Sequence, residues 1–261
     1  MIWIYSLVVL CATTIGAVAG LGGGVIIKPC FDMLAFHDAA TIGVYSSIAV
    51  FTMCIVSIFK QLRHGARFDA MTVVMISIGS ILGGFVGEWV FNQVNVLFPS
   101  EGMVKGTQAL LLALTLVGIL IYTLNKEKIR TIRVRNKLVI VLLGLFLGVV
   151  SVFLGIGGGP LNIALLTLFF SFDMKECVVY SIATIFFSQL SKLFQVFVLS
   201  SLVSYDLSPV PMICIAAVAG GYIGTWLNNR LTNRQVEKVY VATMICLLAL
   251  SCFNAARGFL G

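Results

Sequence analysis

Most of this chain consists of apolar runs about 20 residues long, which is the length that an α-helix needs to cross a hydrocarbon core of roughly 30 Å. Only 10% of the 261 residues are charged, whereas a soluble domain has about 25%. The sequence therefore predicts an all-α, polytopic helical membrane protein with about eight transmembrane helices. The expected spans are 2–21, 41–59, 70–91, 106–124, 138–156, 177–200, 208–227 and 239–256.

Two glycine-rich pentapeptides interrupt these runs, GLGGG at 20–24 and GIGGG at 155–159. Each glycine inside a helix costs roughly 1 kcal/mol relative to alanine, so repeated glycines predict a helix break that exposes backbone N–H groups. The apolar pieces that follow, 25–36 and 160–172, are about half as long as a span. They are predicted to be half-helices or re-entrant segments.

The two breaks belong to a repeat that covers the chain at an offset of 135 to 137 residues. The matches are Val-Tyr-Ser at 44–46 and 179–181, Phe68-Asp69 and Tyr205-Asp206, and the segments 83–89 and 220–226. The sequence thus predicts a first four-span repeat at 1–124, a basic linker at 125–137 and a second four-span repeat at 138–261. An even number of crossings per repeat predicts that the two halves have parallel orientation.

Glycines also recur every four residues in the third span of each half, at Gly79, Gly83 and Gly87 and at Gly220 and Gly224. Such rows of small residues let helix backbones approach closely. We therefore expect these glycines to pack against the broken helix of either half rather than to bind a ligand.

The net charge of +7 is concentrated in the linker between the halves. The positive-inside rule predicts that this linker is cytoplasmic, so the charge indicates topology rather than nucleic-acid binding. With eight crossings, both termini share the linker's side and the loop before the last span faces the other side. The basic residues are Lys126, Lys128, Arg130, Arg133, Arg135 and Lys137 in the linker, Lys60, Arg63, Arg67 and Arg257 on its predicted side, and Arg230, Arg234 and Lys238 opposite.

Helices that start after the two breaks would present N–H groups and partial positive charge, which suits an anion. Pro29 and Pro160 follow the motifs and are compatible with such helix starts. The alternative is that the glycines form only a tight corner between packed helices. The predicted substrate-binding residues around the breaks are Gly22, Gly23, Gly24, Lys28, Tyr45, Ser46, Gly157, Gly158, Gly159, Asn162 and Tyr180.

A polar stripe on the predicted sixth span completes this candidate site. It contains Ser181, Thr184, Ser188, Lys192 and Gln195, at steps of three or four residues. A charged residue near the bilayer centre usually faces a cavity or a partner. No carboxylate is expected at the same depth in the membrane as Lys192, and Glu88 is the deepest of them. Lys192 is therefore predicted to be unpaired and to bind a negatively charged ligand. The alternative is that Lys192 snorkels to the surface, as we expect Lys60 to do at the matching place in the first half.

Proton-coupled carriers commonly use carboxylates or histidines within the bilayer, and His37 and His64 both fall in loops. An anion needs no such relay, because an inside-negative potential favours its exit by about 2.3 kcal/mol per charge and 100 mV. Export by uniport is therefore chemically sufficient, and the sequence does not specify a coupling ion. The seven cysteines are scattered and form no C-x-x-C pair, so the sequence indicates no metal site, cofactor or disulfide framework.

The duplicated GLGGG and GIGGG motifs, each followed by a proline, occur with about eight spans in two halves and a basic central loop. Together they resemble the TauE/SafE sulfite-exporter family of inner-membrane permeases, over essentially the whole chain. The resemblance implies transport, often export, of sulfite, organosulfonates or related small anions across the plasma membrane of a prokaryote.

The sequence thus predicts a multi-pass secondary transporter of the bacterial inner membrane and not an enzyme. Its predicted partners are a small anionic substrate and the lipid bilayer, with a homodimer as a candidate assembly. One alternative is a membrane-embedded enzyme or redox carrier, which would need a nucleophile with a base, a metal cluster or paired cysteines. Another is a non-transporting membrane scaffold, which would not need a polar stripe inside the membrane.

Overall fold

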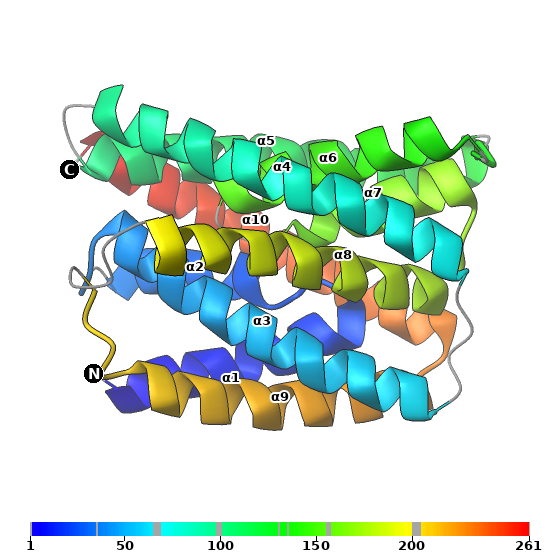
Figure 1. The fold of residues 1–261 in the computed structure, drawn as a ribbon, viewed down its shortest axis with the longest axis horizontal. Helices are drawn as coiled ribbons and strands as arrows, with labels where there is room; N and C mark the ends of the chain where they lie inside the picture. Colours follow the sequence, from blue (N-terminus) through cyan, green and yellow to red (C-terminus); the bar gives the residue numbers. More distant parts are fainter. Residues whose placement is uncertain are drawn as a thin grey trace.

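The computed structural model describes residues 2–34, 36–64, 69–97, 101–129, 131–134, 136–154, 158–199 and 205–260. Across these residues the protein is helical, and the helices run along one long axis of the molecule (Figure 1). Seven helices of the described chain are long and apolar enough to cross a membrane. The predicted class, a polytopic helical membrane protein, is confirmed.

The same order of helix lengths occurs twice along the chain. The first half contains α1 (Ile2–Ala19), α2 (Gly24–Leu34), α3 (Ala39–Arg63), α4 (Ala70–Leu97) and α5 (Glu101–Asn125), and the 3-10 turn η1 (Lys126–Lys128) follows. The second half contains α6 (Lys137–Phe153), α7 (Gly159–Phe170), α8 (Met174–Phe194) with its π-helical extension η2 (Gln195–Leu199), α9 (Val210–Arg230) and α10 (Asn233–Leu260). Among the described helices, α2, α6 and α7 are too short to be counted as full spans.

Each half begins with a hairpin of two helices around the glycine motif. In the first half, the Tyr5 hydroxyl near the start of α1 hydrogen-bonds to Nδ1 of His37 just beyond α2, at 2.8 Å. In the second half, Ser171 at the end of α7 donates to the hydroxyl of Thr131, in the linker before α6, at 2.6 Å. Each short helix therefore returns the chain to the end where its hairpin began, which confirms the predicted re-entrant segments.

The two halves are inverted relative to each other, so the predicted parallel orientation is wrong. Both termini lie at one end of the molecule, the terminal end, where Arg257 donates to the carbonyl oxygen of Met33 at 2.9 Å (Figure 1). The linker lies at the opposite end, the linker end, where Lys126 pairs with Glu237 at the start of α10. The reason is the number of crossings in each half. The hairpin adds no net crossing, so each half crosses three times, and an odd number of crossings inverts the second half relative to the first.

This topology also corrects the predicted sides of the loops. Lys60 near the end of α3 donates to the carbonyl oxygen of Tyr222 in α9 at 2.9 Å, so α3 and α9 end together at the linker end. The described basic residues of that end include Arg63, Lys126, Lys128, Arg133, Lys137, Lys175, Arg230, Arg234 and Lys238, whereas Lys105 and Arg257 lie at the terminal end. Both termini therefore lie opposite the basic linker. Arg67, Arg130 and Arg135 are outside the described residues.

The halves interlock, because the third-span helix of each half packs against the broken helix of the other. Helix α4 packs along α6, and α9 packs along α1. A Cβ atom on Gly83 would lie 2.1 Å from the carbonyl oxygen of Leu145, and one on Gly220 would lie 2.0 Å from the Thr13 hydroxyl. These distances leave no room for a side chain, so the predicted packing role of the glycines is confirmed.

Helices α3 and α8 form the central pair of the molecule. Phe51 and Phe186 occupy equivalent positions in the two halves, and their rings stack at 5.0 Å. This contact lies close to the pseudo-twofold axis that relates the halves, and an inverted repeat places that axis in the membrane plane.

Candidate functional site

The two glycine motifs contact each other inside the molecule. A Cβ atom on Gly159 would lie 2.1 Å from the carbonyl oxygen of Leu21 in the other motif. Gly22 and Gly23 have φ angles of +79° and +75°, a left-handed conformation that favours glycine. Helix α2 begins directly afterwards at Gly24, and its first N–H groups have no acceptor within the helix. The predicted breaks thus occur together, at one place in the fold.

Polar side chains predicted as ligands lie beside the breaks. Gly158 precedes α7 with φ of +68°. The Ser181 hydroxyl donates to the carbonyl oxygen of Gly20 at 2.6 Å. Asn162 donates to the Ser181 carbonyl oxygen at 3.5 Å, and its own Oδ1 is buried without a partner. The structure therefore brings Asn162 and Ser181 to the first motif. Phe68, Gly155, Ile156 and Gly157 are outside the described residues.

The rest of the stripe on α8 and η2 bonds mostly to backbone. Thr184 and Ser188 donate to carbonyl oxygens of the preceding turn, at 2.8 and 3.0 Å. Gln195 donates to the carbonyl oxygen of Gly84 in α4 at 3.4 Å. Ser46 is buried on the facing helix α3. Gln195 lies 14 residues after Ser181, about 21 Å along the helix from the break.

The hydroxyl groups of Tyr45 and Tyr180 do not bond to the glycine motifs but to the backbone before α9 and before α4, toward opposite ends of the molecule. The Tyr45 hydroxyl donates to the carbonyl oxygen of Asp206, just before α9. The Tyr180 hydroxyl accepts from the N–H of Asp69, just before α4, at 2.7 Å. Each tyrosine therefore holds the start of the third-span helix of the other half.

Lys192 is paired with a carboxylate, so the prediction that it is unpaired is wrong. Its Nζ lies 3.8 Å from Oε2 of Glu88, with side-chain exposures of 5% and 10%. The pair depends on α4 packing against α8, a contact between the halves that the inverted topology creates. At the equivalent positions in the other half, the hydroxyls of Ser57 and Thr225 form a hydrogen bond of 2.9 Å. Lys192 is also buried too deeply to snorkel to the surface.

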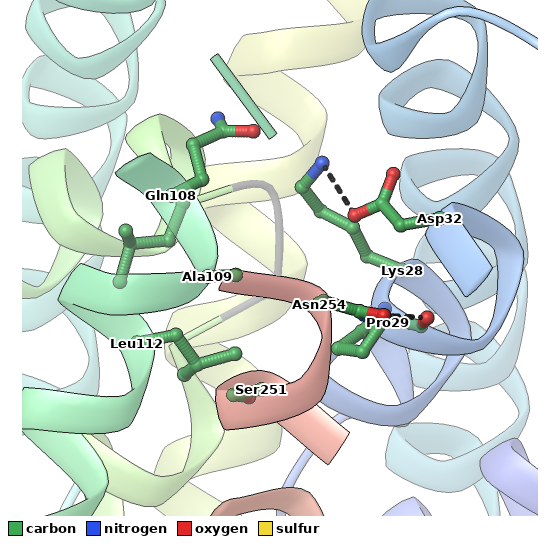
Figure 2. A pocket seen from close by; sticks show the side chains of 9 residues that line it. Lys28, Pro29, Asp32, Gln108, Ala109, Leu112, Ser251 and Asn254 are labelled. Atoms are coloured by element: carbon green, nitrogen blue, oxygen red, sulfur yellow. Dashed lines mark hydrogen bonds and ion pairs between the residues drawn. The ribbon is translucent and has the colours of Figure 1, made fainter. Parts of the chain in front are cut away.

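A second buried ion pair lies on the short helix α2, where Nζ of Lys28 is 3.3 Å from Oδ2 of Asp32 (Figure 2). A small cavity of about 10 Å³ borders this pair, and we name it the inner pocket. It lies between α2, α5 and α10, and its polar lining consists of Lys28, Asp32, Gln108, Ser251 and Asn254. Asp32 and Glu88 are both largely buried carboxylates, so the expectation that the chain has no carboxylate available for a proton relay is wrong.

Three polar atoms in the lining of the inner pocket are buried without a hydrogen-bond partner. They are Oδ1 of Asp32, Oε1 of Gln108 and Oγ of Ser251. In contrast, the amide nitrogens of Gln108 and Asn254 donate to backbone carbonyl oxygens of α6 and α2, at 2.7 and 2.9 Å. An unsatisfied buried polar group costs about 1–3 kcal/mol. Three such atoms around one cavity indicate a place where a hydrogen-bond donor binds.

A wider cavity of about 130 Å³ adjoins the inner pocket toward the terminal end, and we name it the terminal cavity. It shares Asp32 and Asn254 with the inner pocket and adds Lys105 of α5 and Arg257 of α10. Lys105 also donates to the carbonyl oxygen of His37 at 2.9 Å, which fixes its ammonium group there. Two cations and one carboxylate make the charge of this lining positive.

Apart from Lys28, the residues of the inner pocket are missing from the sequence-based site. Asp32 follows Lys28 by four residues, a spacing that predicts an ion pair on a helix. Gln108, Ser251 and Asn254 are polar interruptions of the predicted spans 106–124 and 239–256. Each signal is visible in the sequence, but the contact between α2, α5 and α10 follows from the inverted packing.

An inverted repeat with two broken, re-entrant helices at its centre defines the class of protein, a membrane protein built like a secondary transporter. A family model described as "Sulfite exporter TauE/SafE" matches residues 5–251, and the chain belongs to this family. A curated relative, "Probable membrane transporter protein YunE" of Bacillus subtilis (strain 168), is 25% identical over 275 residues, which cover 93% of this chain and 93% of the relative. No solved structure matches the chain.

Proposed function

We propose that this protein is a secondary transporter that moves small sulfur-containing anions, such as sulfite or an organosulfonate, across the plasma membrane. The observation that supports an anion as the substrate is the positive charge of the terminal cavity. This cavity presents Lys105 and Arg257 at its rim and borders the inner pocket, where Lys28 is buried. In surroundings of low dielectric constant, these cations attract an anion more strongly than they would in water.

The proposed anion path runs from the terminal cavity past Lys28 to the glycine breaks. Lys28 lies one turn after the start of α2, so its charge adds to the positive end of the helix dipole. Asn162 and Ser181 extend this polar path at the breaks, and Lys192 adds a second buried cation on α8.

We propose that the linker end is cytoplasmic, because the loop residues there are predominantly basic and the positive-inside rule then applies. The terminal cavity would face the opposite side of the membrane. Export would release the anion through this cavity, and the family's description as a sulfite exporter supports that direction.

Purified protein in liposomes tests the proposal. We expect sulfite flux above that of protein-free liposomes, and Lys28→Met should lower it about 10- to 100-fold, because a charged hydrogen bond contributes about 1.5–3 kcal/mol. Lys60→Met is the matched control, since Lys60 is also buried but lies at the linker end. Absence of wild-type flux with sulfite, thiosulfate, sulfoacetate and taurine would refute transport, and full flux in Lys28→Met would exclude Lys28 from the path.

A further inference from the structure

We propose that Asp32 carries a proton together with each anion, so that the protein is an electroneutral proton–monoanion symporter. This inference rests on the proposed anion transport and names the group that couples it to the proton gradient. It names a coupling ion, which the sequence leaves open.

The geometry around Asp32 fits a carboxyl group that alternates between two protonation states. Its Oδ2 faces the Lys28 ammonium at 3.3 Å, and its Oδ1 is buried without a partner. Oε1 of Gln108, another acceptor without a donor, lines the same pocket. Protonation of Asp32 would supply the donor that this group of oxygens lacks.

The two cavities differ in what they can hold. The inner pocket, at about 10 Å³, is close to the smallest cavity that holds one water molecule, about 10–15 Å³. It has no room for an anion with several oxygen atoms while Lys28 and Asp32 are paired. The terminal cavity of about 130 Å³ is large enough for several waters and touches Asp32, so a proton can pass between the carboxylate and that side.

Several helices contribute charged or titratable groups around α2. The cations nearest to Asp32 come from α2 itself and from α5 and α10. The tyrosines of α1 and α3 pack around the terminal half of α2, next to His37. In the described residues these groups are Lys28, Lys105, Arg257, Tyr5, Tyr45 and His37.

Charge balance then couples the proton to the anion. With Lys28 protonated and Asp32 ionised, the empty site is neutral. An anion that displaces Asp32 from Lys28 leaves a net charge of −1, and a proton on Asp32 without an anion leaves +1. Only the site that holds both the anion and the proton is neutral again. Because an unpaired buried charge is strongly unfavourable, the half-loaded forms are suppressed and the two ligands cross together.

The proton step is a simple acid–base exchange. On the side opposite the terminal cavity, a proton from water forms an O–H bond on Asp32, and the released Lys28 ammonium pairs with the anion. At the terminal cavity the anion leaves, Asp32 returns its proton to water, and the ion pair re-forms. Since no net charge crosses, a pH difference of one unit balances an anion gradient of about tenfold. Export then proceeds whenever the internal anion excess is larger than the opposing pH gradient.

Proteoliposomes that contain a luminal pH dye test this proposal with radiolabelled sulfite, at a pH where the monoanion predominates. In the wild type, we expect proton movement with sulfite, about tenfold accumulation per pH unit, and no response to an imposed membrane potential. Sulfite flux that follows the potential and moves no protons would overturn the coupling while leaving anion transport intact. Absence of flux with sulfite and with each of the other compounds named above would instead refute the proposed function itself.

Asp32→Asn provides a second, independent readout. Asparagine cannot lose a proton, so the variant site is neutral with an anion bound but positive when empty. We expect sulfite–sulfite exchange to persist and net flux to fall at least about tenfold, because only the loaded site can cross. Glu237→Gln is the control, since Glu237 is an ion-paired carboxylate far from the site, and it should keep both activities. Equal net flux in Asp32→Asn and wild type would overturn the proposal.

Discussion

The buried pair between Lys192 and Glu88 offers a test of the fold, because the equivalent positions in the other half hold an uncharged, hydrogen-bonded pair. The pair joins α8 to α4 at 3.8 Å, while the equivalent residues Ser57 and Thr225 join α3 to α9 through a hydrogen bond of 2.9 Å. The same helix contact is therefore compatible with a charged or a neutral pair. Lys192→Met and Glu88→Gln replace the charges and keep the side-chain volumes.

The expected change in the free energy of unfolding follows from the burial of this pair. At 3.8 Å the two groups are too far apart for a hydrogen bond, and their exposures of 5% and 10% leave little access to water. Lys192→Met alone leaves a buried carboxylate without a partner, which costs about 3–5 kcal/mol. Removing both charges removes that penalty. We therefore expect the double variant to be within about 1 kcal/mol of the wild type, and more stable than either single variant.

Denaturant unfolding in detergent, followed by helical circular dichroism, measures these differences. Lys126→Met is the matched control, because the pair between Lys126 and Glu237 is closer, at 2.5 Å, but its side chains are partly exposed, at 27% and 29%. Its loss should cost less than about 1 kcal/mol. If the double variant lost as much stability as the two single variants combined, the pairing would be refuted. Sulfite flux should stay low in the stable double variant, which separates the role of Lys192 in transport from its role in folding.

Three further outcomes follow from the packing and the loops. Gly83→Leu should prevent folding, because its Cβ would lie 2.1 Å from a carbonyl oxygen of α6, whereas Gly118→Leu has open space and should give wild-type yield in membranes. Tyr180→Phe removes the acceptor for the Asp69 N–H, and because Asp69 is exposed and its N–H can turn to water, the change should cost only about 0.5–1.5 kcal/mol in denaturant unfolding. A hydrogen bond from the Thr72 hydroxyl is the main cause that lowers the pKa of Asp69. This contribution to stability is present above the ordinary carboxyl pKa and is lost as pH falls through the lowered one, so amide exchange at the start of α4 should speed up in acid.

The helix breaks and the packing glycines are predictable from sequence because both depend on local backbone chemistry. Glycines at φ near +79° and +75° and glycines that touch a facing backbone occur where the motifs place them. The orientation of the second half depends instead on whether a short segment crosses or returns. The length of 25–36 indicates a half-helix, yet counting 2–21 as a full crossing gives four crossings per half, and one miscounted crossing reverses every later loop.

The charges of the site show the same division between local and long-range information. The spacing of Lys28 and Asp32 encodes their ion pair locally. The pair of Lys192 and Glu88 joins residues more than a hundred positions apart, through a contact between α4 and α8. No pattern within either helix specifies that contact. A polar residue in an apolar run therefore predicts that a partner exists, but the partner's identity comes from the topology.

The two buried ion pairs lie toward the terminal end, and their equivalents toward the linker end are uncharged. Lys28 and Asp32 correspond to Ile163 and Thr167, and Lys192 and Glu88 correspond to Ser57 and Thr225. Backbone features such as the breaks, the interlocked glycine helices and the tyrosine contacts occur in both halves. An inverted repeat needs that backbone symmetry, because each half can then adopt the shape of the other when the site changes the side it faces. The charges need no second copy, since a single site serves both conformations. Anion binding at one site per chain, rather than one per half, is the stoichiometry that this asymmetry implies.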